Sequence, residues 1–265
     1  MKLTTLVENE KSCALENVHG LSVYIEANGK KILFDFGPDD TFLKNAEILG
    51  IDISQVDVAI LSHGHSDHGG GIKTFLEVNS KAKIYAQKSA FDDHFSSSNG
   101  VMRPIGIDYH LKKHPQIVPL CGEFKIDENM ELFLVSDQSR CRSTANDTLF
   151  AYGKQDEFIH EQQFIIREKD KTALIIGCGH CGIVNILERA KEYAPDICVG
   201  GYHLYSATAK KTVSKALLNE ICINLEKYYN VKFYTCHCTG EKAFTFMQEH
   251  LPGMHYLKCG GEISI

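Results

Sequence analysis

The sequence predicts an α/β protein in which strands and helices alternate in both halves of the chain. Short apolar runs bounded by turn residues, the pattern of buried strands, recur along it. The segments between them carry apolar residues at helical spacing. The clearest example lies within residues 210–229, where one stripe contains Val213, Leu217, Ile221 and Leu225. Such alternation is typical of sheets covered by helices.

The first part of the chain begins with a predicted hairpin, because Asn28-Gly29 is a favourable two-residue turn. The helix that follows is expected to end at Gly50, since glycine commonly closes helices. Residues 56–62 form a nearly continuous apolar run, as expected for a strand covered on both faces. The predicted elements are strands 21–28 and 31–37, helix 41–50, strand 56–62, helix 71–78 and strand 82–87.

The second part resumes the alternation after a looser segment. Residues 88–130 contain a Ser-Ser-Ser-Asn-Gly run and three prolines, and loops of this length in compact domains are usually functional or mobile. We therefore predict one domain over residues 1–265 with a loop-rich insert at about 88–130. The later elements are strands near 131–135, 148–152, 162–167 and 172–177, a helix containing Ile183 to Ala190, strand 196–201, helix 210–229, strand 231–236, helix 241–250 and strand 254–258.

The composition excludes several classes of protein. The chain has 265 residues, 43% of them hydrophobic and 23% charged, which is ordinary for a globular protein. Its formal net charge is −6, and no long run of Lys and Arg could neutralise a phosphate backbone, so we expect no nucleic-acid partner. No apolar stretch approaches the roughly 20 residues that span a membrane, and the N-terminus does not resemble a signal peptide. We expect a cytoplasmic protein with no membrane partner.

Ten cysteines would suggest a disulfide scaffold in a small secreted chain. Here most of them lie in apolar runs, where reduced thiols behave as small hydrophobic side chains. Two clusters differ from this background, "GCGHCG" at residues 177–182 and "TCHCTG" at residues 235–240.

The most informative stretch is "SHGHSDHGGG", residues 62–71, which follows a predicted buried strand. Side chains two residues apart on an extended segment point to the same side, so His63 and His65 can bind one metal ion. Asp67 and His68 follow on the turn and can bind a second ion about 3.5–4 Å away. The three glycines allow the backbone to pass closely into the next helix. A solvated loop of polar residues is the alternative explanation.

The pattern His63-Gly-His65-Ser-Asp67-His68 resembles the HxHxDH motif of the metallo-β-lactamase superfamily. "KILFDFG" (31–37) resembles the segment that precedes this motif. "GCGHCGIVN" (177–185), "GGYHL" (200–204) and "HCTG" (237–240) resemble the branch related to 7,8-dihydropterin-6-methyl-4-(β-D-ribofuranosyl)aminobenzene-5′-phosphate synthase. The resemblance implies a four-layer αββα sandwich with two divalent metal ions at the edge between its two sheets.

Further ligands are expected in the second half, since the four residues of the motif supply only two ligands to each ion. The family places them at strand ends, which implies His180 and His237. The metal ligands are then His63, His65, Asp67, His68, His180 and His237. We expect zinc, with iron and manganese as alternatives, and we predict catalytic roles for Asp67 and for His203 of "GGYHL". For His203, the alternatives are substrate contact, proton transfer and a structural role.

Cys178-Gly-His180-Cys181 is also the active-site string of dithiol oxidoreductases. That function needs a thioredoxin-like context and an aromatic flank, whereas this chain contains no Trp. We therefore favour metal binding by His180 and leave open whether Cys178 is a ligand, since the family's bridging carboxylate is missing there. A structural zinc site made of Cys178, Cys181, Cys236 and Cys238 would leave the His63 cluster without partners.

Other side chains could support the site. His160 and Glu161 lie near the position of another family histidine, and Glu161-Gln162 could position a ligand. Asp35 is expected to orient a ligand or the loop backbone. The segment 88–130 carries cationic side chains that would suit an anionic substrate, although an ordinary solvated cluster explains them equally well: His94, Arg103, His110, Lys112, Lys113 and His114.

These observations predict a metal-dependent hydrolase of a small phosphorylated or otherwise anionic ester, in which metal-activated water attacks the substrate. The alternative is a transferase similar to the pterin synthase. A diiron redox protein ranks last, because such members carry Glu where this chain has His65 and have an added flavin domain. A non-catalytic zinc-binding role completes the alternatives, and the sequence leaves the substrate and the oligomeric state undetermined.

Overall fold

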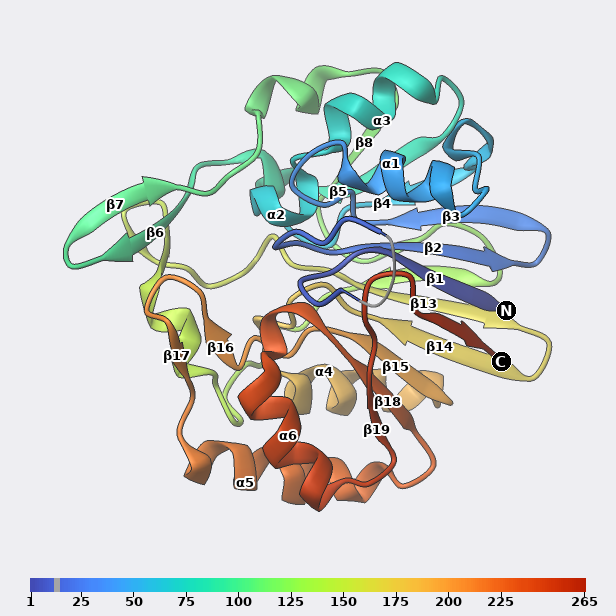
Figure 1. The fold of residues 1–265 in the computed structure, drawn as a ribbon. Coiled ribbons are helices and arrows are strands. Elements are labelled where there is room, and N and C mark those ends of the chain that lie inside the picture. The colour runs from blue at the N-terminus through green and yellow to red at the C-terminus, as the bar shows by residue number, and fades with distance from the viewer. Residues whose placement is uncertain (12–14) are drawn as a thin grey trace. The chain divides into compact units, whose positions relative to one another are not determined.

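The computed structural model describes residues 1–11 and 15–265, which form two compact units. The first unit comprises Met1–Asp93, Ile105–Glu123 and Leu257–Ile265, and the second comprises His94–Pro104 and Phe124–Tyr256. Each unit is built on a seven-stranded sheet with helices (Figure 1). The predicted single domain over residues 1–265 and its insert stay predictions.

The first unit's sheet has the strand order β20-β1-β2-β3-β4-β5-β8. Its strands are β1 (Lys2–Val7), β2 (Ser22–Ala27), β3 (Lys30–Phe34), β4 (Val58–Ile60), β5 (Lys83–Gln87), β8 (Ile117–Leu120) and β20 (Glu262–Ser264). Its helices are α1 (Thr41–Ile48), α2 (Ser66–Gly69) and α3 (Ile72–Val78). β3, β4, β5 and β8 run parallel, so their carboxyl ends share one edge of the sheet.

The expected hairpin joins β2 to β3. Ala27 pairs with Lys30, and the residues between them, Asn28 and Gly29, have φ angles of 53° and 70°. Two consecutive positive φ angles are what a tight hairpin turn of this kind requires. Gly50 closes the first helix as predicted, with φ of 71° and its N–H donated to the carbonyl of Glu47. Local sequence patterns therefore predicted these two features correctly.

The second unit's sheet has the order β19-β18-β15-β14-β13-β10-β9. Its strands are β9 (Phe124–Lys125), β10 (Met130–Phe133), β13 (Gln163–Glu168), β14 (Lys171–Ile175), β15 (Ile197–Gly200), β18 (Lys232–Thr235) and β19 (Met254–Tyr256). Its helices are α4 (Ile183–Ala190), α5 (Lys215–Leu225) and α6 (Glu241–His250). β14, β15, β18 and β19 run parallel, so the loops after them leave the same edge of this sheet.

Two smaller sheets complete the second unit. The first contains β6 (His94–Ser98), β7 (Val101–Pro104), β11 (Leu149–Ala151) and β12 (Lys154–Gln155). The second pairs β16 (Tyr205–Ser206) with β17 (Lys211–Thr212). The looseness of residues 88–130 concealed β6, β7, β8 and β9, because these strands are short and interrupted by prolines and polar residues.

Other elements also differ from the predictions. β1 and β20, which pair with each other across almost the entire chain, were not predicted, because local patterns do not reveal such a distant pairing. The predicted helix over 210–229 was too long: α5 begins at Lys215, after Ser214, whose Oγ accepts a hydrogen bond from the N–H of Leu217. A serine cap of this kind marks a helix start. The apolar stripe identified the helix but not its ends.

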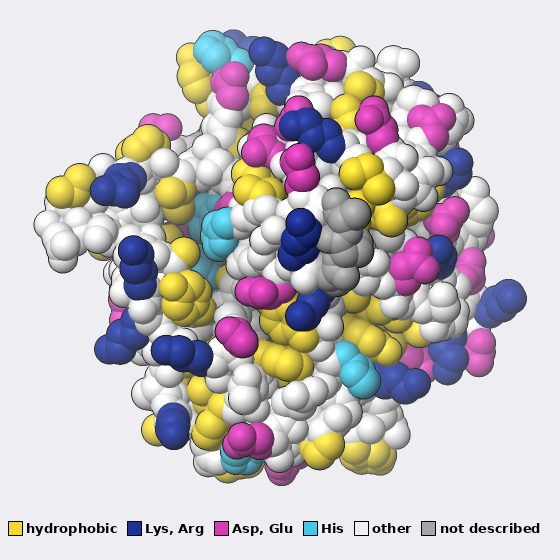
Figure 2. Space-filling model, viewed as in Figure 1, with side chains coloured by type: hydrophobic (Ala, Val, Ile, Leu, Met, Phe, Trp, Pro, Cys, Tyr) yellow, Lys and Arg dark blue, Asp and Glu magenta, His cyan; other side chains and the backbone are white. Residues whose placement is uncertain are grey.

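Apolar packing stabilises the first unit. Phe36 makes edge-to-face contacts with Phe42 and Phe75, at centroid distances of 6.4 and 5.2 Å, and all three side chains are fully buried. On the face seen in Figure 2, acidic and basic side chains are interspersed. Exposed ion pairs such as Lys44–Asp40 contribute little to stability. Among the described residues, no helix combines the length and apolar composition required of a membrane span.

Candidate metal centre

His63 and His65 follow β4 in the first unit and are both buried. Nε2 of His63 lies 3.0 Å from Nδ1 of His65. One ligand atom from each, together with a carboxylate oxygen of Asp67, falls within 4.8 Å of the others. This arrangement agrees with the sequence-based pairing of His63 and His65, while their role as metal ligands stays a prediction.

Asp35, directly after β3, determines how two of the histidines are oriented. Its Oδ1 accepts the Ser62 N–H at 2.7 Å, and its Oδ2 accepts the Ser62 hydroxyl at 2.7 Å and Nδ1–H of His68 at 2.6 Å. The Ser62 hydroxyl in turn lies 2.9 Å from Nδ1 of His63. Because that hydroxyl donates to Asp35, it accepts the proton of His63 Nδ1. Asp35 therefore holds protons on Nδ1 of both histidines.

This choice of tautomer leaves the lone pairs of His63 and His68 on Nε2, the atom each can offer to a metal ion. Nε2 of His68 lies 3.9 Å from Oδ2 of Asp67. The orienting role predicted for Asp35 agrees with these contacts. Buried imidazole nitrogens facing a neighbouring imidazole and a carboxylate are a donor set suited to a divalent ion, so the residues of the first unit fit the metal that the motif implies.

Asp67 has a second partner that the sequence did not indicate. Nε2 of His19 lies 3.3 Å from Oδ2 of Asp67, and both side chains are partly exposed. The glycines after His68 also have a specific role: a Cβ on Gly70 would lie 2.1 Å from the carbonyl oxygen of Pro38. The glycine therefore permits a close approach to neighbouring backbone.

In the second unit, His180 lies in the loop between β14 and α4 and is buried. Its Nδ1 is 3.0 Å from Oδ1 of Asn146, and Nδ2 of Asn146 donates to the His180 carbonyl at 2.9 Å. The amide is thereby oriented so that Oδ1 accepts the proton of Nδ1, which places the lone pair on Nε2. The ring stacks on Phe158 at 4.4 Å. Neither Asn146 nor Phe158 was predicted, since neither lies in a recognisable motif.

Glu161 holds this loop by its backbone. Its carboxylate accepts the N–H groups of His180 and Cys181 at 2.7 and 2.9 Å. Burial raises the pKa of Glu161, although these hydrogen bonds oppose the rise. The supporting role considered for Glu161 agrees with these contacts. The pKa of the Cys181 thiol is raised well above its usual value, first by burial and then by the nearby Glu161 carboxylate.

Cys178 lies closer to the second unit's histidines than its sequence position alone indicated. Its sulfur is within 4.8 Å of a ring nitrogen of His180, of His237 and of His203. His203 and His237 have φ angles of 45° and 50°, which are uncommon for residues other than glycine and often mark functional positions. The ligand roles of His180 and His237 and the catalytic role of His203 stay predictions.

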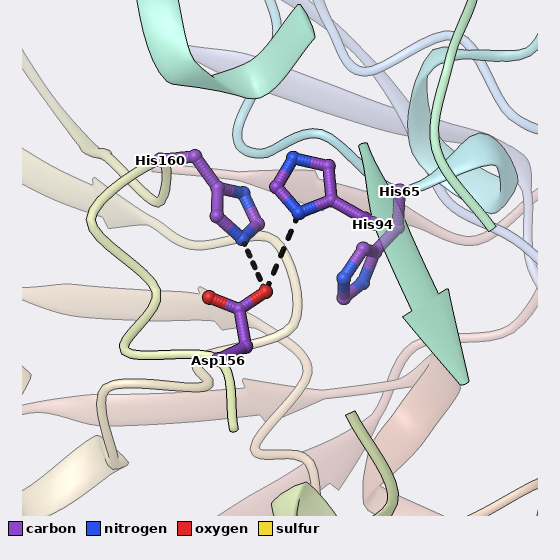
Figure 3. A group of neighbouring side chains, drawn as sticks. All are labelled: His65, His94, Asp156 and His160. Carbon is purple, nitrogen blue, oxygen red and sulfur yellow. Dashed lines mark hydrogen bonds and ion pairs between the residues drawn. The ribbon is translucent and has the colours of Figure 1, made fainter. Parts of the chain in front are cut away.

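A second buried group lies elsewhere in this unit. Asp156, after β12, has an Oδ2 atom 3.1 Å from Nε2 of His160 and 3.4 Å from Nδ1 of His94 (Figure 3). Its other oxygen accepts the N–H of Phe158 at 2.7 Å. His94 is only 1% exposed and contacts Asp156, so it does not belong to a solvated charge cluster, while the cationic substrate loop stays a prediction. His160 is bound to Asp156, a partner that no motif indicated.

We expect Asp156→Asn to destabilise the protein by about 3–5 kcal/mol, because it removes the charge that His160 and His94 share. Burial alone would raise the pKa of Asp156, but hydrogen bonds from the two histidines outweigh it and hold the pKa far below its model-peptide value of 3.8. The stabilisation is therefore complete above about pH 4 and is lost as the pH falls toward the folded-state pKa.

Urea unfolding of wild type and Asp156→Asn at neutral pH and at about pH 3 measures this effect, with a smaller gap expected at the lower pH. Asp147→Asn is the matched control, since Asp147 forms an exposed ion pair with Arg142. It should cost at most about 1 kcal/mol. Equal stability of Asp156→Asn and wild type at neutral pH would contradict the prediction.

Comparisons with known proteins agree with this geometry. Residues 16–121 match the metallo-beta-lactamase superfamily. An uncharacterized protein of Methanocaldococcus jannaschii is 30% identical, over 92% of this chain and 93% of that protein. The 7,8-dihydropterin-6-methyl-4-(beta-D-ribofuranosyl)-aminobenzene-5′-phosphate synthase of the same organism is 28% identical, over 91% of this chain and 88% of that protein. The crystal structure of Tm1679, described as a metal-dependent hydrolase of the beta-lactamase superfamily, aligns with a TM-score of 0.84 and 28% identity. The alignment covers 100% of this chain and 99% of that chain.

The fold and the histidine-rich loops thus define an α/β protein of metallo-β-lactamase fold with candidate metal-binding residues. The chain belongs to the metallo-β-lactamase superfamily. The fold class and the family resemblance inferred from the sequence are confirmed. Members of this superfamily are mostly metal-dependent hydrolases that act on small molecules.

Proposed function

We propose that the protein is a metal-dependent hydrolase with a dinuclear centre that acts on a phosphorylated or other anionic ester. The observation that carries the proposal is the buried chain Asp35–Ser62–His63, with the Asp35–His68 contact beside it. Holding a histidine by a carboxylate at Nδ1 is how proteins prepare Nε2 for a metal ion. A purely structural pair of histidines would not require both rings to present the same nitrogen.

We assign His63, His65 and His180 to one ion, and Asp67, His68 and His237 to the other. When bound, two divalent ions would lower the pKa of water to near neutrality and polarise the ester. The chain's own contribution is orientation: Asp35 positions His63 and His68, and Asn146 positions His180. Asp67 is also proposed to act in catalysis, beside its role as a ligand. His203 is proposed to contact substrate or transfer a proton.

Zinc is the proposed native ion, because imidazole and carboxylate ligands suit it. The cytoplasm is the proposed compartment: the nine cysteines among the described residues are all free thiols, as expected in a reducing environment. Cys13 lies outside the described residues. Exposed basic side chains of residues 105–123, including His110 and Lys113, support an anionic substrate.

A synthase resembling the pterin enzyme is the second candidate, because the M. jannaschii protein with that name aligns over 91% of this chain. The two functions can share one metal centre, so ligand identity does not separate them. The synthase needs a dihydropterin diphosphate and an aminobenzoyl ribose phosphate as joint substrates. The hydrolase needs a single ester and water.

The test is metal analysis of purified protein, followed by assays of the zinc-loaded form with phosphodiesters and lactones and with the two synthase substrates. We expect bound metal, ester cleavage, and no product that requires both synthase substrates. Coupling of the pterin to the acceptor would establish the alternative. Absence of tightly bound metal after reconstitution would remove the basis of both functions, and a fully loaded protein without turnover would indicate a non-catalytic zinc-binding role.

A further inference from the structure

Three neighbouring parallel strands of the second unit bring two cysteines and a histidine together. Cys178 follows β14, His203 follows β15 and Cys238 lies in the short turn after β18. β14 pairs with β15, and β15 pairs with β18, all in parallel. The carboxyl ends of adjacent parallel strands are where α/β proteins usually place binding residues. We call Cys178, His203 and Cys238 the thiol cluster.

Backbone contacts hold the three loops against one another. The sulfur of Cys238 donates to the Cys178 carbonyl and accepts the His203 N–H, both at 3.3 Å. The N–H of Leu204 donates to the Cys238 carbonyl at 3.0 Å. A Cβ on Gly201 would lie 2.5 Å from the Cys238 sulfur, so only glycine lets the loop pass that atom. The cluster is therefore held in place by its surrounding backbone.

The side chains of the thiol cluster converge. The two sulfurs and one ring nitrogen of His203 lie within 4.8 Å of one another. Cys178 and Cys238 are 2% and 4% exposed, and His203 is 9% exposed. Neither ring nitrogen of His203 has a hydrogen-bond partner within the described residues. A buried imidazole without such a partner is costly unless something else satisfies it.

We propose that Cys178, Cys238 and His203 bind a divalent metal ion that favours sulfur ligands, either zinc or ferrous iron. Two sulfurs and one imidazole nitrogen form a donor set that selects these ions over Mg²⁺ and Ca²⁺. The ion would satisfy the His203 ring and take up the two thiolates, whose protons pass to solvent. This role would replace the substrate or proton-transfer role proposed for His203.

The pairing differs from the one that the sequence suggested for a structural zinc site. The sequence suggested a site made of four cysteines, Cys178, Cys181, Cys236 and Cys238, whereas the fold groups Cys178 and Cys238 with His203. Cys181 interacts instead with Glu161, which receives its N–H. The inference extends beyond the proposed hydrolysis, since sulfur ligation in the second unit requires neither an ester substrate nor the ligands of the first unit.

X-ray absorption of the zinc-loaded, reduced wild-type protein provides the first test. Sulfur neighbours are expected at about 2.3 Å from zinc. The sulfur count, defined as the number of zinc-bound sulfurs per protein chain, should be about two. It is obtained by multiplying the number of sulfurs per zinc by the number of zinc ions bound per chain. Cobalt(II) in place of zinc should give a sulfur-to-metal charge-transfer band. An absorption spectrum with nitrogen and oxygen neighbours only would overturn the inference. So would a Cys178–Cys238 disulfide in the reduced preparation, which would lower the protein mass by two hydrogens.

Single-residue variants identify the sulfurs. Cys178→Ser and Cys238→Ser should each lower the sulfur count from about two to about one, whereas Cys222→Ser, a buried cysteine of α5, should leave it unchanged. Unchanged counts in both cluster variants would contradict the assignment. If a variant does not fold, alkylation of wild type with and without zinc gives the same information, because zinc should protect Cys178 and Cys238 and not the exposed Cys121.

One further variant separates this inference from the proposed function. His63→Ala changes the first unit and should abolish ester hydrolysis while the sulfur count stays at about two. Loss of hydrolysis with sulfur ligation intact supports both proposals. Hydrolysis by wild type without any sulfur ligation would overturn only the thiol cluster, and sulfur ligation without hydrolysis would overturn only the proposed function.

Discussion

Asp35→Asn is expected to weaken metal binding by about 10- to 100-fold, the usual effect of losing a carboxylate that orients a ligand histidine. An asparagine side chain can accept hydrogen bonds only at Oδ1, because Nδ2, which replaces the second carboxylate oxygen, is a donor. Its Nδ2 would face the Ser62 hydroxyl and Nδ1 of His68, which both donate to Asp35 in the native protein. His68 would then adopt the tautomer with the proton on Nε2, the atom proposed to bind metal.

The substitution should leave the backbone intact, because Asp35 has φ of 60° and asparagine tolerates this region at least as well. Titration of the apoprotein with zinc against a chromophoric chelator measures the affinity, and circular dichroism checks the fold. Asp57→Asn, at a partly exposed carboxylate of the same unit, is the control and should bind zinc like wild type. Unchanged affinity in a folded Asp35→Asn protein would show that the histidines do not depend on Asp35.

His180→Ala should reduce metal occupancy and turnover more than Asp35→Asn does, because it removes a proposed ligand rather than a partner of one. Asn146 and Glu161 would still hold the surrounding backbone, since they contact the carbonyl and N–H of residue 180. The loss would then be chemical rather than structural. Metal stoichiometry and ester hydrolysis, measured together, test this expectation.

Cys181→Ser is the informative comparison and should be nearly silent. Cys181 lies just before α4, which begins at Ile183. Its thiol is buried and its pKa is raised, so it remains protonated at neutral pH, and a serine hydroxyl can occupy the same position beside Glu161. A dithiol mechanism predicts the opposite order: either cysteine change abolishes activity while His180→Ala only shifts a thiol pKa.

Cys178→Ser separates the remaining possibilities for this stretch. If Cys178→Ser loses metal while Cys181→Ser retains it, Cys178 is a ligand and Cys181 is not. Full metal retention in His180→Ala, with activity lost in Cys181→Ser, would overturn the metal interpretation of Cys178-Gly-His180-Cys181.

Much of the fold could be inferred from local patterns. The Asn28-Gly29 turn, the glycine after α1 and the stripe of α5 each act within a few residues, so the sequence alone specifies them. β1 and β20 could not be found in this way, because they pair across almost the entire chain. Burial of His94 likewise depends on Asp156 and not on its neighbours in sequence.

The amino-acid sequence by itself determined the family and predicted metal binding by residues 63–68, because the spacing of these candidate ligands is a local property that one turn of chain can satisfy. Only the tertiary structure decided which proton each histidine carries, since Asp35 and Asn146 are distant in sequence from the rings that they orient. It also decided that His203 lies beside Cys178 and Cys238. Parallel strands join residues by their place in a sheet, and that order is absent from the spacing of cysteines along the chain.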